Sequence, residues 1–307
     1  MVGKRPLNIE SLRSRPPAGL GLRHWRWKRR HLEEGCFKVL MYASFLIVAG
    51  SLGLILFTVV VKGLPSLNLA MLTQTPKGGY YLGKEGGILN AILGSLYLAG
   101  GGTILALIVS LPIALYLEMY AHHHYAQLVR LSLDVMWGIP SIVYGAFGFT
   151  LMLAVGARAS LLAGILTLAL VELPIMARAV DEVIRLIPDD LEQASLAVGA
   201  TRYETAVIVI IRQVLPGIVT AMLLAFGRGI GDAASVLFTA GYTDRIPHSL
   251  SSPVASLPLA VFFQLGTPYP EVQKRAYAAA LVLTLMILVI SLVSRWLSGR
   301  LERHVVK

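Results

Sequence analysis

Six long apolar runs divide the chain, and shorter polar segments separate them. The runs cover roughly residues 36–61, 88–117, 131–155, 160–180, 217–241 and 275–297. Each is long enough to cross a bilayer as a helix, because about 20 helical residues span the hydrocarbon core. The pattern predicts an all-α membrane protein with six transmembrane helices in one domain, residues 36–297.

The first and last runs are uniformly apolar, whereas the middle four contain prolines, glycine clusters and charges. Helix breakers at membrane depth are tolerated where protein or a cavity surrounds them, and small residues let helices pack closely. We therefore expect the middle four runs to form an inner bundle and the other two to face lipid.

The segment Pro188–Pro216 is the one long polar-rich stretch between apolar runs. A proline opens it, and Asp189, Asp190 and Glu192 follow, where the helix dipole favours anions. Gly199 then interrupts the helical pattern as a C-terminal cap would. The segment predicts a short helix, a glycine turn and a second helix that continues into the fifth apolar run.

The composition of the chain indicates a membrane location, and the distribution of its basic residues indicates its orientation in the membrane. The chain is 56% apolar with a mean hydropathy of +0.69, too apolar for an ordinary soluble domain. With the N-terminus inside, the inner segments hold 16 Lys and Arg and the outer segments hold 5. Basic residues favour the cytoplasmic side, so an N-in, C-in topology is predicted. Segment 181–216 and the tail 298–307 are then cytoplasmic.

The first 35 residues are a separate feature, rich in Pro, Arg and Lys. They are expected to form a basic, disordered cytoplasmic tail. Nine of the 27 Lys and Arg of the chain fall within the first 30 residues. The net charge of +10 is therefore mostly a property of this tail and does not indicate a nucleic-acid-binding surface.

Motifs for enzymatic chemistry are absent from the sequence. There is no G-x-x-x-x-G-K-[ST], no H-E-x-x-H and no cysteine cluster, since Cys36 is the single cysteine. The histidine run 122–124 is interpreted as a solvated loop, because consecutive histidines point in different directions on a helix. We therefore expect no catalytic site, no metal and no cofactor bound by this chain.

Charged residues inside the apolar runs are the candidate functional groups. Arg228 and Asp232 lie near the middle of the fifth run, and Arg178 and Glu182 at the inner end of the fourth. Both pairs have i, i+4 spacing, which places their side chains on one helix face. A central Arg or Asp costs about 2.5–3.5 kcal/mol on insertion, so such residues usually face a bundle interior or an aqueous path.

The two pairs allow two interpretations. An arginine presents a fork of donors suited to an oxyanion, so we interpret all four residues as candidates for an anion path. The alternative is an ion pair that fixes helix packing, which fits Arg178 and Glu182 better because charges at a helix end can snorkel to water. Glu172 lies deeper in the fourth run, and three options stay open for it: a bond to backbone freed by Pro174, an arginine partner, or protonation.

Taken together, these residues resemble the transmembrane permeases of ABC importers. Glu192-Gln193-Ala194 with Gly199 is similar to the family's EAA-x-x-x-G motif, although Gln193 replaces an alanine and the following Leu-Pro comes late, at 215–216. Three further stretches resemble the phosphate-transport permeases of the PstA type, with Asp232 where that type usually has glutamate. They are Thr75–Leu96, Gly138–Phe149 and Gly227–Gly241.

The resemblance implies a type I ABC importer permease fold in a bacterial inner membrane. It implies a homologous second permease, an external phosphate-binding protein and two ATPase subunits, which would hold ATP and Mg²⁺. The implied ATPase contact is the coupling segment, with Asp189, Asp190, Glu192, Gln193, Ala194 and Gly199. Phosphate would pass Arg228 and Asp232. A permease for sulfate or molybdate and an ATP-independent channel or secondary carrier are the alternatives, and the coupling segment disfavours the latter.

Overall fold

A computed structural model describes residues 20–77 and 85–301 of the 307-residue chain. The first 19 residues of the predicted tail, residues 78–84 between the first and second apolar runs, and residues 302–307 lie outside the described residues. The chain divides into two compact units, residues 1–57 and 58–307.

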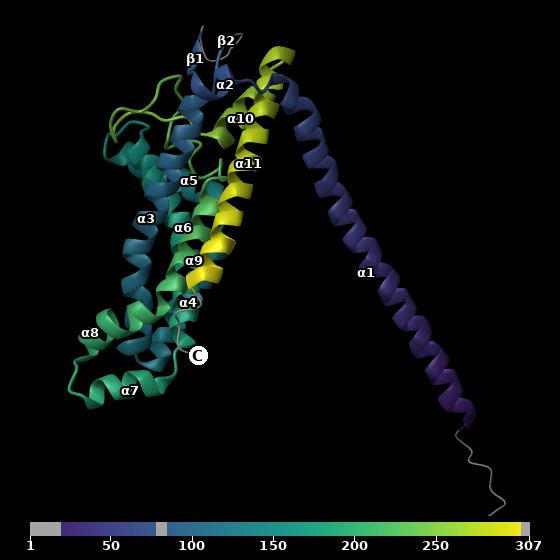
Figure 1. The fold of residues 1–307 in the computed structure, drawn as a ribbon, viewed down its shortest axis with the longest axis vertical. Helices are drawn as coiled ribbons and strands as arrows, with labels where there is room; N and C mark the ends of the chain where they lie inside the picture. Colours follow the sequence, from purple (N-terminus) through teal and green to yellow (C-terminus); the bar gives the residue numbers. More distant parts are fainter. Residues whose placement is uncertain (1–19, 78–84, 302–307) are drawn as a thin grey trace, which may run out of the picture. The chain divides into compact units, whose positions relative to one another are not determined.

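Helix α1, Leu20–Gly63, begins in the first unit (Figure 1). It starts 16 residues before the predicted apolar run, inside the stretch that the sequence suggested to be disordered. This stretch contains Leu, Arg, Lys and Glu, which favour helices, and has no proline after Pro17. The most apolar part of the helix has a mean hydropathy of 2.5, which is typical of a membrane span.

The second unit contains the remaining helices. The long ones are α3 (Leu89–Met119), α4 (His123–Gly138), α5 (Ser141–Ala154), α6 (Leu161–Arg185), α9 (Ile211–Gly229) and α11 (Pro270–Leu301). The short ones are η2 (Leu64–Ser66), α2 (Leu69–Thr73), α7 (Asp189–Ala197), α8 (Arg202–Glu204), the π-helix η3 (Thr205–Ile210) and α10 (Leu257–Leu265). Strands β1 (Pro76–Lys77) and β2 (Glu85–Gly86) pair antiparallel, with Pro76 opposite Gly86.

Five helical segments of the described chain are long and apolar enough to cross a membrane, and a bent pair makes a sixth. The six-span prediction agrees with this count. The third span is not the straight helix expected over residues 131–155, because α4 and α5 meet at 96°. The break falls at Ile139-Pro140, where the proline disfavours helical backbone in the preceding residue.

The fifth span also differs from the prediction. It was expected over residues 217–241, and the structure instead has continuous helix from Arg202 to Gly229. Its early start follows from η3, which joins α8 to α9 without a break. Its early end falls in the run Gly227, Gly229 and Gly231, where glycines have low helix propensity. The prediction of helix over residues 230–241 is therefore wrong.

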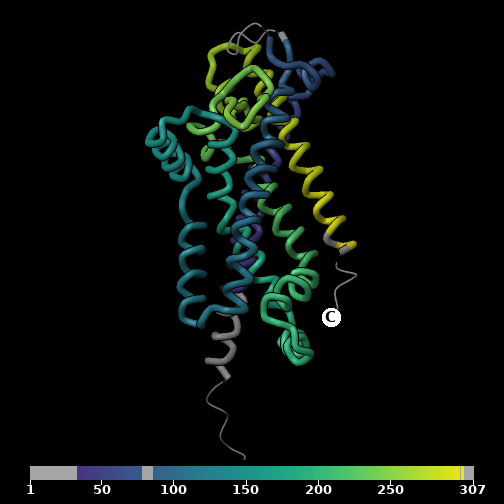
Figure 2. Tube along the Cα trace, turned by 90° about the vertical axis from the view of Figure 1, so that its left-hand side faces the viewer, coloured from purple at the N-terminus to yellow at the C-terminus, as the bar shows by residue number. Residues whose placement is uncertain are grey.

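Helices α3, α6 and α9 form the centre of the second unit. Gly101 and Gly102 of α3 lie against Ile165 and Leu168 of α6, so the absence of side chains lets the two helices approach closely. Figure 1 shows α7 beyond one end of α3, with α8 beside that end, and the β1–β2 ladder beyond the other end. Figure 2, turned by 90°, also shows α7 and the ladder at opposite ends of α3. In the N-in topology the α7 end is cytoplasmic and the ladder is external.

Candidate functional site

Arg228 and Asp232 do not form the predicted pair on one helix face. Arg228 lies in the last turn of α9. Asp232 lies in the turn that follows, and its backbone N–H donates to the Gly229 carbonyl at 3.1 Å. The Asp232 Oδ1 accepts from the Ser235 N–H at 3.0 Å. No ion pair joins Arg228 and Asp232 among the described residues, because the helix ends between them.

The depth of Arg228 nevertheless fits a position near the membrane centre. The neighbouring Gly229 lies against the carboxyl of Glu172, and a Cβ at this glycine would overlap Glu172 Oε1. Glu172 is the twelfth of the 25 residues of α6. Arg228 is therefore level with the middle of α6, and its side chain is exposed on the surface of this chain.

Glu172 is fully buried between α3, α6 and α9, with 0% exposure. Its Oε2 accepts a hydrogen bond of 2.8 Å from the Thr103 hydroxyl of α3. Its Oε1 has no hydrogen-bond partner among residues 20–77 and 85–301. Of the three options that the sequence left open, an arginine partner is excluded within the described residues, and the one bond goes to a side chain rather than to freed backbone.

Arg178 does not pair with Glu182 as the i, i+4 spacing suggested. Its Nε lies 2.8 Å from Asp134 Oδ1 of α4, and its Nη1 donates to Asp181 Oδ2 at 3.3 Å. Asp181 is fully buried, and Glu182 is exposed. The inward face of α6 therefore carries Asp181, so the prediction for Arg178 named the wrong carboxylate.

A charge cluster at the inner ends of α3, α4 and α6 surrounds Asp181. Arg130 of α4 donates to both Asp181 oxygens at 2.9 Å and also bonds Glu118 at the end of α3. Arg185 lies 3.5 Å from the same Glu118 carboxylate. The sequence alone does not indicate this cluster, because Arg130 and Asp181 are 51 positions apart. The only local signal is the i, i+3 spacing of Arg178 and Asp181.

The coupling segment has the predicted helix, glycine turn and second helix. Helix α7 begins directly after Pro188, and none of its residues is buried. Gly199 has φ of +91°, a left-handed conformation that favours glycine. Large apolar side chains flank the helix in solvent, with Leu186 76% exposed and Val198 85% exposed. Exposed apolar surface beside polar residues is typical of a protein interface.

Short polar contacts fix the coupling segment to the bundle. The Ser195 and Thr205 hydroxyls are 2.9 Å apart, which joins α7 to η3. Arg202 Nη1 donates to the Met119 carbonyl at the end of α3 at 3.1 Å. Thr201 and Glu204 form a capping box at the start of α8. These contacts connect α7 to the start of the fifth span and α8 to the end of α3.

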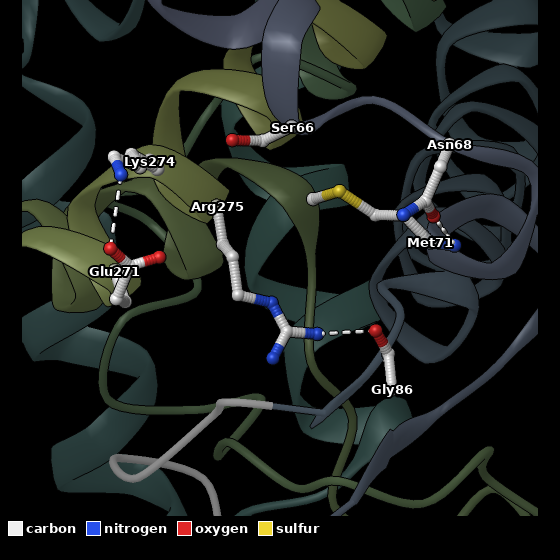
Figure 3. Close-up of a pocket in the computed structure, with 7 residues that line it drawn as sticks. All are labelled: Ser66, Asn68, Met71, Gly86, Glu271, Lys274 and Arg275. Carbon is white, nitrogen blue, oxygen red and sulfur yellow. Dashed lines mark hydrogen bonds and ion pairs between the residues drawn. The ribbon is translucent and has the colours of Figure 1, made fainter.

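The external end holds a polar pocket of about 420 Å³ (Figure 3). Its wall is formed by η2, α2, β2 and the first turns of α11, through Ser66, Asn68, Met71, Gly86, Glu271, Lys274 and Arg275. Arg275 reaches from α11 to donate to the Gly86 carbonyl at 2.6 Å. Lys274 lies 3.0 Å from the Glu271 carboxylate. The pocket therefore presents more basic than acidic side chains.

Comparison with known proteins places these features in a family. Residues 110–307 match the family described as the inner membrane component of binding-protein-dependent transport systems. The chain belongs to this family. The matched residues of this inner membrane component include the coupling segment, Glu172, Arg228 and Asp232. The chain is thus a multi-pass membrane protein of a transport system.

Relatives of this inner membrane component are similar over most of their length. The phosphate transport system permease protein PstA of Haemophilus influenzae is 31% identical over 274 residues, which cover 89% of this chain and 94% of that protein. PstA 1 of Mycobacterium tuberculosis is 32% identical over 271 residues, which cover 86% of this chain and 87% of that protein.

Solved structures show the same fold. A chain of a bacterial alginate ABC transporter, crystallised with a periplasmic protein, has a TM-score of 0.61 at 14% identity and covers 92% of this chain and 99% of its own. A chain of the inward-facing MetNI methionine ABC transporter has a TM-score of 0.56 at 19% identity, with 69% and 95% covered. The inner membrane component has the type I ABC importer permease fold.

Proposed function

We propose that this chain is the transmembrane permease subunit of an ATP-driven phosphate importer. The curated relatives support phosphate as the cargo, since they are named as phosphate transport permeases. The observation that carries the proposal is Arg228. It is exposed at the mid-depth of α6, and no described residue forms an ion pair with it.

The position of Arg228 indicates where the path runs. A cation on the lateral surface of a single permease faces either lipid or a second protein, and lipid cannot solvate it. A homologous second permease would supply the other wall of the path. Arg228 would offset the desolvation of phosphate through its fork of N–H donors. Asp232 would accept a hydrogen bond from a protonated phosphate oxygen.

Arg178 and Glu182 mark the inner end of the same path in this proposal. Arg178 is held by Asp134 and Asp181, so a passing anion would meet a partly neutralised cation there. Glu182 is exposed, and its charge would disfavour an anion lingering at the inner end. These two residues are secondary to Arg228, which has no such partner.

The coupling segment would dock on a separate ATPase subunit, one of two in the transporter. ATP and Mg²⁺ would be held by that subunit, and this chain would hydrolyse nothing. Asp189, Asp190, Glu192, Gln193, Ala194 and Gly199 would form the contact. Closure of the ATPases would move α7, and the contacts to Thr205 and Met119 would pass this movement to the bundle.

An external phosphate-binding protein would deliver the cargo. The external pocket lined by Lys274 and Arg275 is a suitable contact point for acidic side chains of that protein, because its basic residues outnumber its acidic one.

The cargo assignment is tested with Arg228→Gln in the assembled transporter, reconstituted in liposomes with ATP and the binding protein. Phosphate uptake should fall at least about tenfold, since a loss of about 1.4 kcal/mol of anion stabilisation already gives this factor. Arg245→Gln, at an exposed external position, is the matched control. Near-normal uptake by Arg228→Gln would remove Arg228 from the path. If sulfate or molybdate competed for uptake more strongly than unlabelled phosphate, the cargo would be assigned to that oxyanion instead.

Coupling is tested with Gly199→Val. No atom lies within 4 Å of the added Cβ, so the change acts through the left-handed φ, which costs on the order of 1–3 kcal/mol for a β-branched residue. ATP hydrolysis should continue with reduced uptake, or the ATPase should fail to copurify. Gly156→Val is the control, because Gly156 has φ of +68° and also has open space. Intact coupling in Gly199→Val would contradict the docking role.

A further inference from the structure

We propose that Glu172, with the Thr103 hydroxyl and the Gly229 backbone, forms a proton-binding site at the centre of the permease. The carboxyl is protonated in this conformation and must stay protonated for an anion to pass Arg228. The first part rests on the structure of this chain, and the consequence for transport rests on the proposed function.

The Glu172 carboxyl fills a closed space inside the helix bundle. Glu172 is completely buried where α3, α6 and α9 meet. Gly229 is the residue whose missing side chain makes room for it, because any Cβ there would overlap Oε1. The carboxyl therefore lies against the backbone of α9 at the point where this helix ends.

The surroundings of the Glu172 carboxyl determine its charge. Ionised carboxylates away from water are stable only when cations and several donors surround them. Glu172 accepts one hydrogen bond from a neutral hydroxyl, and its other oxygen has no hydrogen-bond partner in the part of the chain that the structure describes. No Lys, Arg or His of the described chain forms an ion pair with it. The neutral acid is the form that this environment accommodates.

Two charged residues flank the part of the chain that contacts Glu172. Arg228 of α9 and Asp232, which follows α9, are the charged residues nearest in sequence to Gly229, which lies against the Glu172 carboxyl. Helix α3 contributes the Thr103 hydroxyl, and its one acidic residue, Glu118, belongs to the inner charge cluster. With Glu172 neutral, the centre carries one positive and one negative charge. Loss of the proton would leave an excess negative charge beside the path and repel a phosphate anion.

Glu172→Gln provides the direct test, because glutamine has the shape of the protonated acid and cannot ionise. Phosphate uptake by the reconstituted transporter is measured over a pH series, and the ratio of wild type to variant cancels the titration of phosphate itself. We expect this ratio to fall at alkaline pH, by up to about tenfold per pH unit. Glu34→Gln, an exposed carboxyl on α1, should follow the wild type.

A second measurement does not depend on transport. Infrared spectra of the purified complex should show a carboxylic acid C=O band that Glu172→Gln lacks and Glu34→Gln retains. Thr103→Val removes the hydroxyl that favours the ionised form, so it should move the alkaline fall to higher pH. This variant keeps the test available if Glu172→Gln assembles poorly.

The outcomes separate the two proposals. An inactive Glu172→Gln, a pH profile equal to that of wild type, or the absence of the acid band would overturn the proton site. An acid band assigned to Glu172 in a transporter that moves no phosphate would retain the proton site and overturn the proposed cargo.

Discussion

Two carboxyl groups of α6 are equally buried, yet they have opposite surroundings. Asp181 and Glu172 both have 0% exposure. Asp181 accepts two hydrogen bonds from Arg130 and a third from Arg178. Glu172 accepts one, from a neutral hydroxyl. The comparison teaches that burial alone does not define the role of an acid, because the partners decide whether its charge is retained.

The difference also separates two mechanical regions. At the inner end, paired charges fasten α3, α4 and α6 together beside the coupling segment. At the centre, α3, α6 and α9 meet around the Glu172 carboxyl, with which no cationic side chain of the described residues forms an ion pair. The inner ends of the helices, which would receive force from the ATPase, are therefore joined by ion pairs. The region around Glu172, where cargo would pass, is joined by weaker polar contacts.

Substituting both acids by amides of the same shape should produce the largest contrast. Asp181→Asn leaves Arg130 and Arg178 without their shared charge, and the loss of a buried ionic partner typically costs about 3–5 kcal/mol. Glu172→Gln should stay within about 1 kcal/mol of wild type, since only a neutral hydrogen bond changes. Thermal unfolding of the purified complex measures both. Equal destabilisation would mean that the two acids have the same charge state.

Filling the space beside Glu172 should have an intermediate effect. Gly229→Ala places a Cβ onto Oε1, and overpacking of this kind typically costs about 1–3 kcal/mol. Gly227→Ala is the matched control, because nothing lies within 4 Å of its added Cβ. Combining Gly229→Ala with Glu172→Ala should recover part of the loss. If Gly229→Ala unfolds like Gly227→Ala, the carboxyl is not held against α9.

Removing the single donor to Glu172 should have the smallest effect on stability. Thr103→Val keeps the shape and removes one neutral hydrogen bond, with an expected cost of about 1 kcal/mol. Arg130→Gln, which removes the two-pronged donor to Asp181, should cost several times more in the same unfolding measurement. A cost for Thr103→Val that matches Arg130→Gln would show that Glu172 carries a charge.

The features that the sequence predicted depend on local signals. The lengths of the apolar runs gave the spans, and Pro188, the acidic first turn and Gly199 gave the coupling segment. These signals act over a few residues, because caps and left-handed glycines are determined by adjacent backbone. The prediction of a disordered tail was based on its charge and did not include the helix that begins at Leu20. Arg, Lys and Glu are polar and also have high helix propensity, so charge alone does not indicate disorder there.

The features that escaped prediction depend on packing between distant segments. Apolar and small residues continue past Gly229, so hydropathy alone does not mark the end of α9. Arg130 lies 51 positions from Asp181, and Thr103 lies 69 positions from Glu172, so only the close approach of α3, α4 and α6 brings these partners together. The i, i+4 interpretation of Arg178 and Glu182 failed because spacing alone does not show which face of α6 is buried.

The π-helix between α8 and α9 affects the direction in which later side chains point around the helix axis. Each residue of an α-helix turns the chain by about 100°, and a π-helical turn accommodates extra residues within a helix that continues on either side. Thr205–Ile210 therefore sets the angle at which Arg228 points relative to Arg202, 26 positions earlier on one continuous helical rod. Deleting a single residue within 206–210 would rotate the arginine by roughly a quarter of a turn about the helix axis and would leave Arg202 and Thr205, which anchor the cytoplasmic segment, in place.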